Sequence, residues 1–404
     1  MTLYAGLDLN ATRLRGVDGS PTSTSQPLVL EAAAGGPLPL ALSLEGRSPE
    51  VGLAGFRICR RLPHLACLGF VQHVAGERRW SVGRHNIDAD QALAVAFKQI
   101  KPALAEVAAA ALALPSYLTR EQNSRVLAVA KQAKLPIRGW VSAPLALVAT
   151  AWGVDPWFGP ALVLDVDDHA LTWAAVTVDE PPAPRQARLL ALQTAPGLGL
   201  RVWKEALLNS LADRCVRQSR RDPREFADTE QALWEQFDSA MEKCRQAKFV
   251  DLVVQTERYY QDIVLQPEEF EGFCGGLVKE ALAGVDELLE AAKIEHPPSF
   301  VLATAAAARL PGLLNALTDA SPARTHLVTL AADAVSQAAL DLAIRWEDET
   351  LPAGPIERTV PLKKSGKPQA RPAKPATKSN TKLPARSTKQ RHGDEDDFSV
   401  TIDE

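Results

Sequence analysis

Acidic side chains close two apolar, strand-like segments of this 404-residue chain. Asp8 stands near the end of segment 3–9, and Asp165 ends segment 161–165. The second acid is soon followed by the run Asp167-Asp168-His169, whose carboxylates and imidazole are all types of metal ligand. Such a run could bind a divalent cation, or it could form an exposed polar turn. Of these two interpretations we favour the exposed turn.

The cysteines and histidines do not indicate a second kind of site. The seven histidines are scattered, so they predict no metal centre. The five cysteines are widely spaced and include no C-x-x-C pair, which predicts buried free thiols rather than a disulfide framework or a zinc site. They are Cys59, Cys67, Cys215, Cys244 and Cys274.

The elements that must position the two acidic segments repeat along the chain. A strand pair at 3–9 and 12–17 opens the first half, and a second pair at 161–165 and 171–177 opens the second half, which indicates an internal duplication. Strand and helix patterns alternate elsewhere, and this alternation predicts a mixed α/β fold. Further strands are expected at 28–31, 38–44, 108–114, 137–141, 250–256, 262–265 and 299–303, and helices at 90–105, 119–133, 144–152, 200–217, 229–248, 267–292 and 310–317.

Composition sets limits on the class of protein. With 46% hydrophobic residues, the chain can bury a large core, and its length fits two or three domains or one large bilobal unit. No apolar run reaches the roughly 20 residues that cross a bilayer, and the first residues lack an export signal. We therefore expect a cytoplasmic protein without a membrane partner.

The C-terminal residues differ from the rest of the chain. Beyond Leu351, large apolar residues almost vanish, which predicts disorder. Eleven cations between Arg358 and Arg391 and six acids from Asp394 onward give this tail a charge of +5, against −9 for the remainder. The cations could bind nucleic acid, but no aromatic residue is interleaved among them, so we favour a solubilising extension. The alternating segment Phe398–Ile402 could dock as a strand.

The middle of the first half carries a family resemblance. The residues L-A-L-P-S-Y-L-T (112–119), continuing through A-T-A-W-G (149–153), resemble the nucleotide-binding domain of the seventy-kilodalton heat-shock chaperones, which belong to the actin-like ATPase superfamily. The resemblance spans about 3–346, with a shortened region around 63–88. It implies a bilobal actin-like ATPase (ribonuclease H-like) fold, with residues 1–158 and 328–346 in lobe I, 159–327 in lobe II, and 347–404 as a disordered tail.

The same resemblance places the family's two phosphate-binding loops on the acidic segments. The first loop falls on Asp8-Leu9-Asn10-Ala11-Thr12, where Asp8 and Thr12 are kept and Asn10 replaces a glycine. The second falls on 165–172, where Asp165 is kept and three glycines are replaced by Asp167, Asp168 and His169. Added carboxylates repel phosphate, so the resemblance implies ATP or ADP with Mg²⁺ as a weak ligand at most. Alternatively, Asp8 simply ends a strand at a turn.

The adenosine-binding positions are kept in part. The resemblance implies that Glu242 binds ribose, that Arg245 is a nearby base and that Arg309 stacks on the purine, while Gly199 survives from a phosphate-contacting motif. Alternatively, Glu242 and Arg245 are solvated residues of an amphipathic helix, and Gly199 is a simple strand-to-helix turn.

No catalytic residue is implied. Ala143 stands where the family has its catalytic glutamate, and no lysine lies near Cys67, where the family has its catalytic lysine. The sequence also has no counterpart of the client-binding domain. We therefore expect a catalytically impaired ATPase scaffold that acts as a binding or regulatory module with protein partners. The alternative is a divergent ATPase that uses Asp8, Asp165, Glu242 and Arg309 in a rearranged site.

Overall fold

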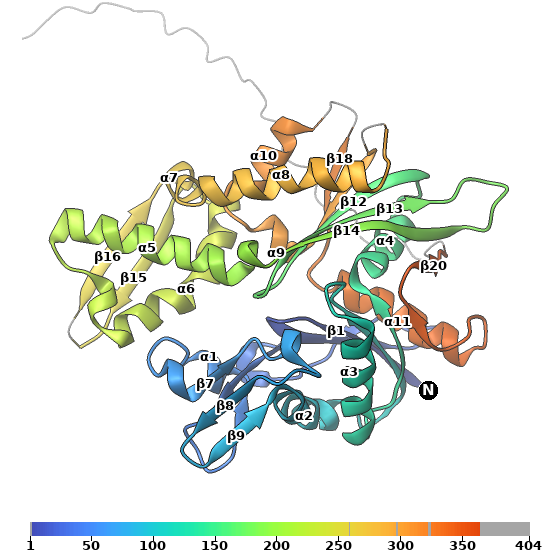
Figure 1. Cartoon of the computed structure of the whole chain (residues 1–404), viewed down its shortest axis with the longest axis horizontal. Coiled ribbons are helices and arrows are strands. Elements are labelled where there is room, and N and C mark those ends of the chain that lie inside the picture. The colour runs from blue at the N-terminus through green and yellow to red at the C-terminus, as the bar shows by residue number, and fades with distance from the viewer. Residues whose placement is uncertain (1, 258, 296–297, 322–324, 364–404) are drawn as a thin grey trace, which may run out of the picture. The chain divides into compact units, whose positions relative to one another are not determined.

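Two large mixed sheets form the framework of the chain (Figure 1). The computed structural model describes residues 2–257, 259–295, 298–321 and 325–363. The first sheet has the order β19-β11-β10-β1-β2-β3, with β4 added beside β2, and the second has the order β18-β17-β12-β13-β14-β20. The strands of the first sheet are β1 (Leu3–Leu9), β2 (Arg13–Gly19), β3 (Gln26–Pro27), β4 (Leu38–Pro39), β10 (Val107–Leu114), β11 (Ile137–Ser142) and β19 (Pro355–Ile356). Those of the second are β12 (Gly159–Val166), β13 (Leu171–Val178), β14 (Gln186–Ala195), β17 (Phe300–Ala303), β18 (His326–Thr329) and β20 (Thr359–Pro361).

Both sheets have the same topology at their centres. In the first, β1 pairs antiparallel with β2 and parallel with β10, which is parallel to β11. In the second, β12 pairs antiparallel with β13 and parallel with β17, which is parallel to β18. The third strand of each meander, β3 or β14, pairs with the second. The duplication predicted from the repeated strand pairs is therefore confirmed at the level of strand order.

Helices α4 (Ala143–Val154) and α11 (Ala334–Glu347) lie between the two sheets (Figure 1). Alternate residues of β12 show how this layering arises: Ala161 and Val163 pack toward these helices, whereas Leu162 and Leu164 face the other side. Strands buried on both faces read as continuous apolar runs, as β10 and β12 do. One apolar core thus joins both sheets through α4 and α11.

The outer faces of the sheets are covered by other helices. Helices α2 (Ala89–Ile100) and α3 (Arg120–Gln132) pack on the first sheet. Helices α5 (Leu200–Ser219), α6 (Ala227–Gln246) and α8 (Gly275–Ala291) share the core on the outer side of the second. The shorter helices are α1 (Leu53–Phe56), α7 (Pro267–Gly272), α9 (Ala305–Ala308) and α10 (Leu313–Ala320). The smaller sheets are formed by β5 (Ala41–Ser43), β6 (Glu50–Val51) and β7 (Ala66–Leu68), by β8 (Arg79–Val82) and β9 (His85–Asp88), and by β15 (Val250–Gln255) and β16 (Tyr260–Leu265).

Local signals in the sequence are confirmed where a cap or a long periodic pattern carries them. Thr119 caps α3, and its side chain and that of Gln122 form the expected reciprocal capping box. The predicted helix 267–292 is instead divided into α7 and α8, and the predicted helix 310–317 begins later, because Gly312 adopts a positive φ of 77° before α10. Strand 28–31 is not formed, and β14 and β18 were not expected.

The expected disordered tail from 347 onward is wrong for its first part. After α11 the chain forms a strap, residues 351–363, whose β19 pairs with β11 and whose β20 pairs with β14. The few apolar residues of the strap, Ile356, Val360 and Leu362, are buried in the core between the sheets. Averaged composition hides such a small number of anchors. Residues 364–404, which include most of the basic run and the segment 398–402, lie outside the described residues.

Two further expectations concern boundaries and burial. The proposed boundary between 327 and 328 falls inside β18, so Val328 and Thr329 belong to the second sheet. All five cysteines are buried, as expected. Across the part of the chain that the structure describes, none of the helices combines the length and apolar character required to cross a membrane.

Gly6 allows β1 and α11 to pack backbone to backbone. A Cβ atom at this position would lie 2.0 Å from the Ser336 carbonyl oxygen and 2.2 Å from the Leu340 nitrogen. We predict that Gly6→Ala lowers the free energy of unfolding by at least about 2 kcal/mol, because neither obstructing atom belongs to a flexible side chain. Urea denaturation measures this change.

Gly276→Ala provides the matched control, because a Cβ atom there would meet no heavy atom within 4 Å. We expect that control to change stability by less than about 1 kcal/mol, in the stabilising direction. Equal effects of the two substitutions would contradict the close packing of α11 on β1.

Candidate functional site

The loops that follow β1 and β12 are bound to each other. The first loop is residues 10–12, and the second loop is residues 167–170. The Asp167 side chain is 4% exposed, and one of its oxygens, Oδ2, accepts hydrogen bonds from the Ala11 amide (2.8 Å) and the Tyr117 hydroxyl (2.5 Å). Its Oδ1 accepts bonds from the amides of His169 (2.9 Å) and Ala170 (3.0 Å). One buried carboxylate therefore joins both sheets through four donors.

Thr12 and Asp168 form a second link between the loops. The Thr12 hydroxyl accepts a hydrogen bond from the Asp168 amide (2.8 Å) and donates one to the Asp168 carboxylate (3.1 Å). The Asn10 side-chain oxygen accepts bonds from the amides of Thr12 and Arg13, both at 3.0 Å. In this Asx arrangement the side chain of Asn10 closes its own turn.

These bonds occupy the amides that a phosphate would need. A cradle for phosphate depends on free backbone N–H groups that point at the anion. Here the amides of residues 10–13 and 167–170 all donate to protein oxygens, the remaining two being Asn10 to the Arg13 carbonyl and Asp167 to the Ala170 carbonyl. The described residues of the two loops therefore do not fit a bound triphosphate.

Asp8, Asp165 and Asp168 lie at or next to the two loops, and burial is the largest cause of the raised pKa of each. Burial, with Asp8 and Asp167 adding to it, raises the pKa of Asp165 to about 7. Burial also raises the pKa of Asp8, although Arg13 and Arg15 oppose the shift. The pKa of Asp168 is raised by burial as well, and Lys204 opposes that shift. Close carboxylates that are poorly solvated retain protons more strongly.

Tyr117 and His169 complete the surroundings of Asp167. Burial, then the charge of Asp167, raises the pKa of Tyr117 well above its ordinary value, so its hydroxyl stays protonated and able to donate. The Tyr117 and His169 rings meet edge to face with centroids 4.8 Å apart. Burial lowers the pKa of His169, which favours its neutral form.

Three charged side chains from α5, α6 and the end of α9 form a network next to the loops. Lys204, 3% exposed, donates to the Asp238 carboxylate at 2.7 Å, and Arg309 pairs with the same carboxylate at 2.7 Å. Burial by itself would raise the pKa of Asp238, but Lys204 and Arg309 together lower it. The Lys204 ammonium also lies 5.5 Å from the centroid of the Trp234 ring. Lys204 is therefore already fixed by neighbours.

A second contact between the two halves of the chain lies beside α1. The Gln231 side chain on α6 accepts from the Arg60 amide (2.7 Å) and donates to the Phe56 carbonyl (2.9 Å). The Arg60 guanidinium pairs with Glu205 and lies 3.8 Å from the centroid of the Trp234 ring. Nearby, Ile58 and Cys59 enter the core of the second half. The two halves are thus joined on this side as well.

The structure brings together some of the site residues predicted from the resemblance. Asp8 is 6% exposed near the end of β1, and its charge adds to the raised pKa of Asp165 near the end of β12. Thr12 contacts the second loop, and Arg309 is held by Asp238. Gly199 is the N-cap of α5, where an added Cβ atom would lie 2.5 Å from the His169 carbonyl carbon. Gly199 therefore allows α5 to approach the second loop closely.

Glu242 and Arg245 are not brought to the loops by any hydrogen bond or ion pair among the described residues. They pair with each other at 3.7 Å on α6, and Glu242 also accepts from Gln246 at 2.6 Å. Both side chains are partly exposed, at 48% and 34%. Their contacts match the alternative that they are solvated residues of an amphipathic helix.

The interpretation of residues 167–169 as an exposed polar turn is wrong for Asp167. Its burial follows from four hydrogen-bond donors supplied partly by distant residues, which a local turn pattern does not reveal. Sequence reasoning also missed Tyr117, Lys204 and Asp238. Cys67, the position to which the resemblance assigns a lysine, is fully buried in the core of the first sheet. In the described residues no group of three or more acidic, histidine or cysteine side chains could hold a metal ion.

Comparison with known proteins adds no family assignment. No protein-family model matches the sequence, and a search of curated proteins returns no match.

Removal of the Asp167 carboxylate should unlink the two loops. We predict that Asp167→Ala lowers the free energy of unfolding by about 3 kcal/mol or more, because it leaves buried donors of Ala11, Tyr117 and His169 unpaired. Chemical denaturation measures this loss. Asp251→Ala is the matched control: that carboxylate is 59% exposed and pairs with Lys243, so its removal should cost less than about 1 kcal/mol. Similar losses in the two variants would show that Asp167 does not link the loops.

The raised pKa of Asp165 predicts an unusual pH dependence of stability. The folded chain holds this proton up to about pH 7, whereas the ordinary pKa of an aspartate, 3.8, applies in the unfolded chain. Between these pH values the folded state binds more protons than the unfolded state, so the contribution of Asp165 to stability falls as pH rises. We predict that Asp165→Asn is more stable than the wild type at pH 8, and that the difference shrinks toward pH 4.

Asparagine keeps the oxygen that accepts a hydrogen bond from the Val166 amide (2.9 Å). Thermal or chemical unfolding of both proteins across pH 4–8 tests this prediction. A stability difference that does not change with pH would mean that Asp165 titrates normally in the folded chain.

Proposed function

We propose that this chain is an actin-like ATPase scaffold, of the kind found in the seventy-kilodalton heat-shock chaperones, that has lost ATP hydrolysis and acts as a protein-binding or regulatory module. The fold part of this proposal is supported by the shared strand order of the two sheets and by the pair of helices, α4 and α11, packed between them. The first and second loops follow β1 and β12, which have equivalent positions in their sheets. Two related halves would show this correspondence.

The position of the Asp167 carboxylate is the main support for the proposed loss of ATP hydrolysis. It accepts from amides of both loops, at 2.8 Å from Ala11 and 2.9–3.0 Å from His169 and Ala170. An anion that belongs to the protein thus uses the donors that a bound phosphate would use. A second anion at this place would meet both electrostatic repulsion and saturated donors.

The catalytic groups of an ATPase are also lacking in this region. Ala143, which begins α4, has no group that could orient water or accept a proton. Lys204 is a buried cation whose charge opposes the rise in the pKa of Asp168, but its ammonium is fixed by Asp238 at 2.7 Å and by aromatic rings. Phosphoryl transfer depends on positioned water and charge stabilisation, and these residues supply neither.

One observation favours the alternative of a divergent ATPase. Arg15 and Arg309 are close enough to influence one another, and Arg13 adds a third guanidinium. Burial, with Arg13 adding to it, lowers the pKa of Arg15 to about 10. The Nε atoms of Arg13 and Arg309 are buried without a hydrogen-bond partner among the described residues. This group of cations would allow an anion to bind if the loops separated.

Calorimetric titration with Mg-ATP tests the proposal. We predict no measurable heat for the wild type, because its loop amides are already bonded. Asp167→Gly should gain affinity for ADP or inorganic phosphate, because it frees amides of both loops and removes a negative charge. Asp262→Gly, which changes an acid on the distant strand β16, serves as the control and should stay silent. ATP turnover by the wild type that is abolished in Asp8→Ala would refute the proposal and favour the divergent ATPase.

A further inference from the structure

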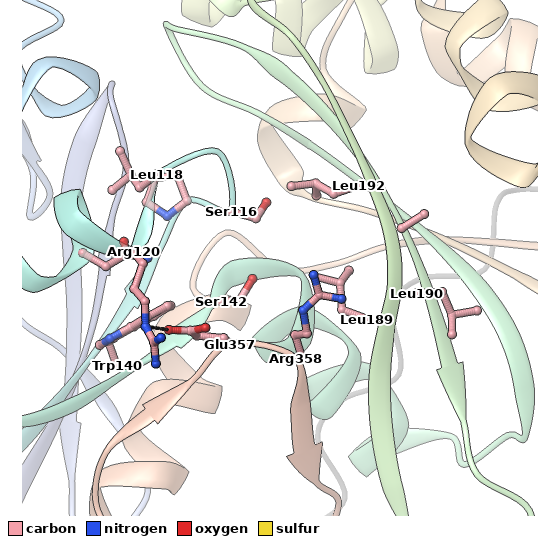
Figure 2. A pocket seen from close by; sticks show the side chains of 13 residues that line it. Ser116, Leu118, Arg120, Trp140, Ser142, Leu189, Leu190, Leu192, Glu357 and Arg358 are labelled. Atoms are coloured by element: carbon pink, nitrogen blue, oxygen red, sulfur yellow. Dashed lines mark ion pairs between the residues drawn. The ribbon is translucent and has the colours of Figure 1, made fainter. Parts of the chain in front are cut away.

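A cavity of about 270 Å³ opens where the strap crosses from the first sheet to the second (Figure 2). It lies near the ends of β10 and β11, next to β14. No residue of the first loop or the second loop lines it. Figure 2 shows Leu118, Arg120 and Trp140 on one side, and Leu189, Leu190 and Leu192 along the second sheet on the other. The hydroxyls of Ser116 and Ser142 lie between these two walls.

Ser142 and Asn123 belong to the inner wall of the cavity. They are 4% and 5% exposed, and the Ser142 hydroxyl oxygen and the Asn123 side-chain oxygen are enclosed by protein. A ligand in the cavity would therefore meet the apolar side chains of the walls and the neighbouring strand edge rather than these two atoms.

The edge of β14 is uncovered beside the same cavity. β20 pairs with residues 186–188, and the Leu189 amide donates to the Arg358 carbonyl at 2.8 Å. The strap then leaves β14, because Pro355 and Ile356 pair with β11 instead. From 190 to 195, β14 has β13 on one side and no other strand among the described residues on its other side. A register shift at Leu190, which has no partner in β13, lies at the point where the strap departs.

The arginine side chains at the mouth of the cavity indicate the charge that a partner would carry. Arg358 is exposed and has no ion pair among the described residues, whereas Arg120 has one at 3.5 Å with Glu357. Apolar side chains form part of the walls: Leu118 and Trp140 are buried, and Leu192 is 37% exposed. A strand edge, an apolar wall and an unpaired cation together match an extended peptide that carries alternating apolar residues and one acid.

We propose that β14 residues 190–195 bind such a peptide as an added strand, with its apolar side chains against Leu192 and Trp140 and its carboxylate near Arg358. The main chain of the peptide supplies hydrogen bonds to the open edge of β14. This inference rests on the proposed role as a binding module and names the chemistry of the partner. It does not depend on the state of the nucleotide loops.

The probe for the test is a fluorescein-labelled, amidated hexapeptide, Thr-Val-Thr-Leu-Asp-Thr, titrated with the full chain and followed by fluorescence anisotropy. Two further versions carry N-methyl groups at alternate residues, one version for each edge of the peptide strand. We expect one N-methylated version to bind about tenfold more weakly or worse and the other to bind as the parent does, because an added strand uses one edge. Equal binding of both versions, or no binding of the parent, would overturn the proposal.

Substitutions in the chain locate the site. Leu192→Asp and Arg358→Glu should each weaken binding about tenfold, and a peptide with Lys in place of Asp should restore binding to Arg358→Glu. The matched controls are Val29→Asp, at a side chain that is 62% exposed elsewhere, and Arg47→Glu, in an exposed loop. These controls should bind as the wild type does. Loss of binding in the controls alone, or no loss in Leu192→Asp, would place the peptide elsewhere and refute this site.

Failure of the peptide site can be distinguished from failure of the proposed function. Peptide binding that is unchanged by 1 mM Mg-ATP, a concentration on the order of the upper range of enzyme KM values, supports both proposals. Failure of the peptide to bind, with Mg-ATP still giving no heat, would refute the peptide site and leave the loss of ATPase activity standing.

Discussion

The buried carboxylate of Asp167 is the interaction on which the arrangement of the two loops depends. It receives hydrogen bonds from the loop after β1, from its own loop and from Tyr117 after β10. A buried charge without such partners would be very costly, whereas one with four short hydrogen bonds is stable. The same arrangement fixes Thr12 against Asp168 and leaves the loops without free amides. The Asp167 carboxylate therefore both links the two loops and occupies amides that a bound phosphate would need.

The apolar layer between the sheets extends this linkage across the chain. Helices α4 and α11 contact both sheets, and Gly6 lets α11 approach β1 at backbone distance. The strap adds one short strand to each sheet, and Ile356 and Val360 complete the same core. On the other side, Gln231 and Arg60 bind residues of the opposite half. Several independent contacts thus hold the loops in the arrangement that Asp167 closes.

The distribution of charge distinguishes two regions with different chemistry. The first region contains Asp8 and Asp165 near the ends of β1 and β12, and Asp167 and Asp168 in the second loop. Burial raises the pKa of Asp8, Asp165 and Asp168. The cavity at the strap instead has apolar walls and exposed cations. The first region is closed by bonds within the protein. The second has an open strand edge beside apolar side chains, and the proposed peptide site is based on these two features.

The sequence by itself determined features that local patterns encode. The strand pairs that open each half, the helix capped by Thr119 and the burial of the cysteines all follow from spacing, capping and apolar content, and the structure has them. The acids at the strand ends were also visible, because a polar residue after an apolar run is a local signal. The family relationship and the function inferred from it remain proposals.

Tertiary structure decided the features that depend on distant partners. From the sequence, Asp167 is predicted to belong to an exposed turn. In the structure it is buried and accepts a hydrogen bond from the amide of Ala11, which lies 156 positions earlier. The strap reads as disordered because its anchors, Ile356 and Val360, are few, and their burial requires two sheets that are formed by other segments. Glu242 and Arg245, in contrast, pair locally instead of reaching the loops. Long-range hydrogen bonds and shared burial leave no periodic signal along a chain, and for that physical reason only the fold could reveal them.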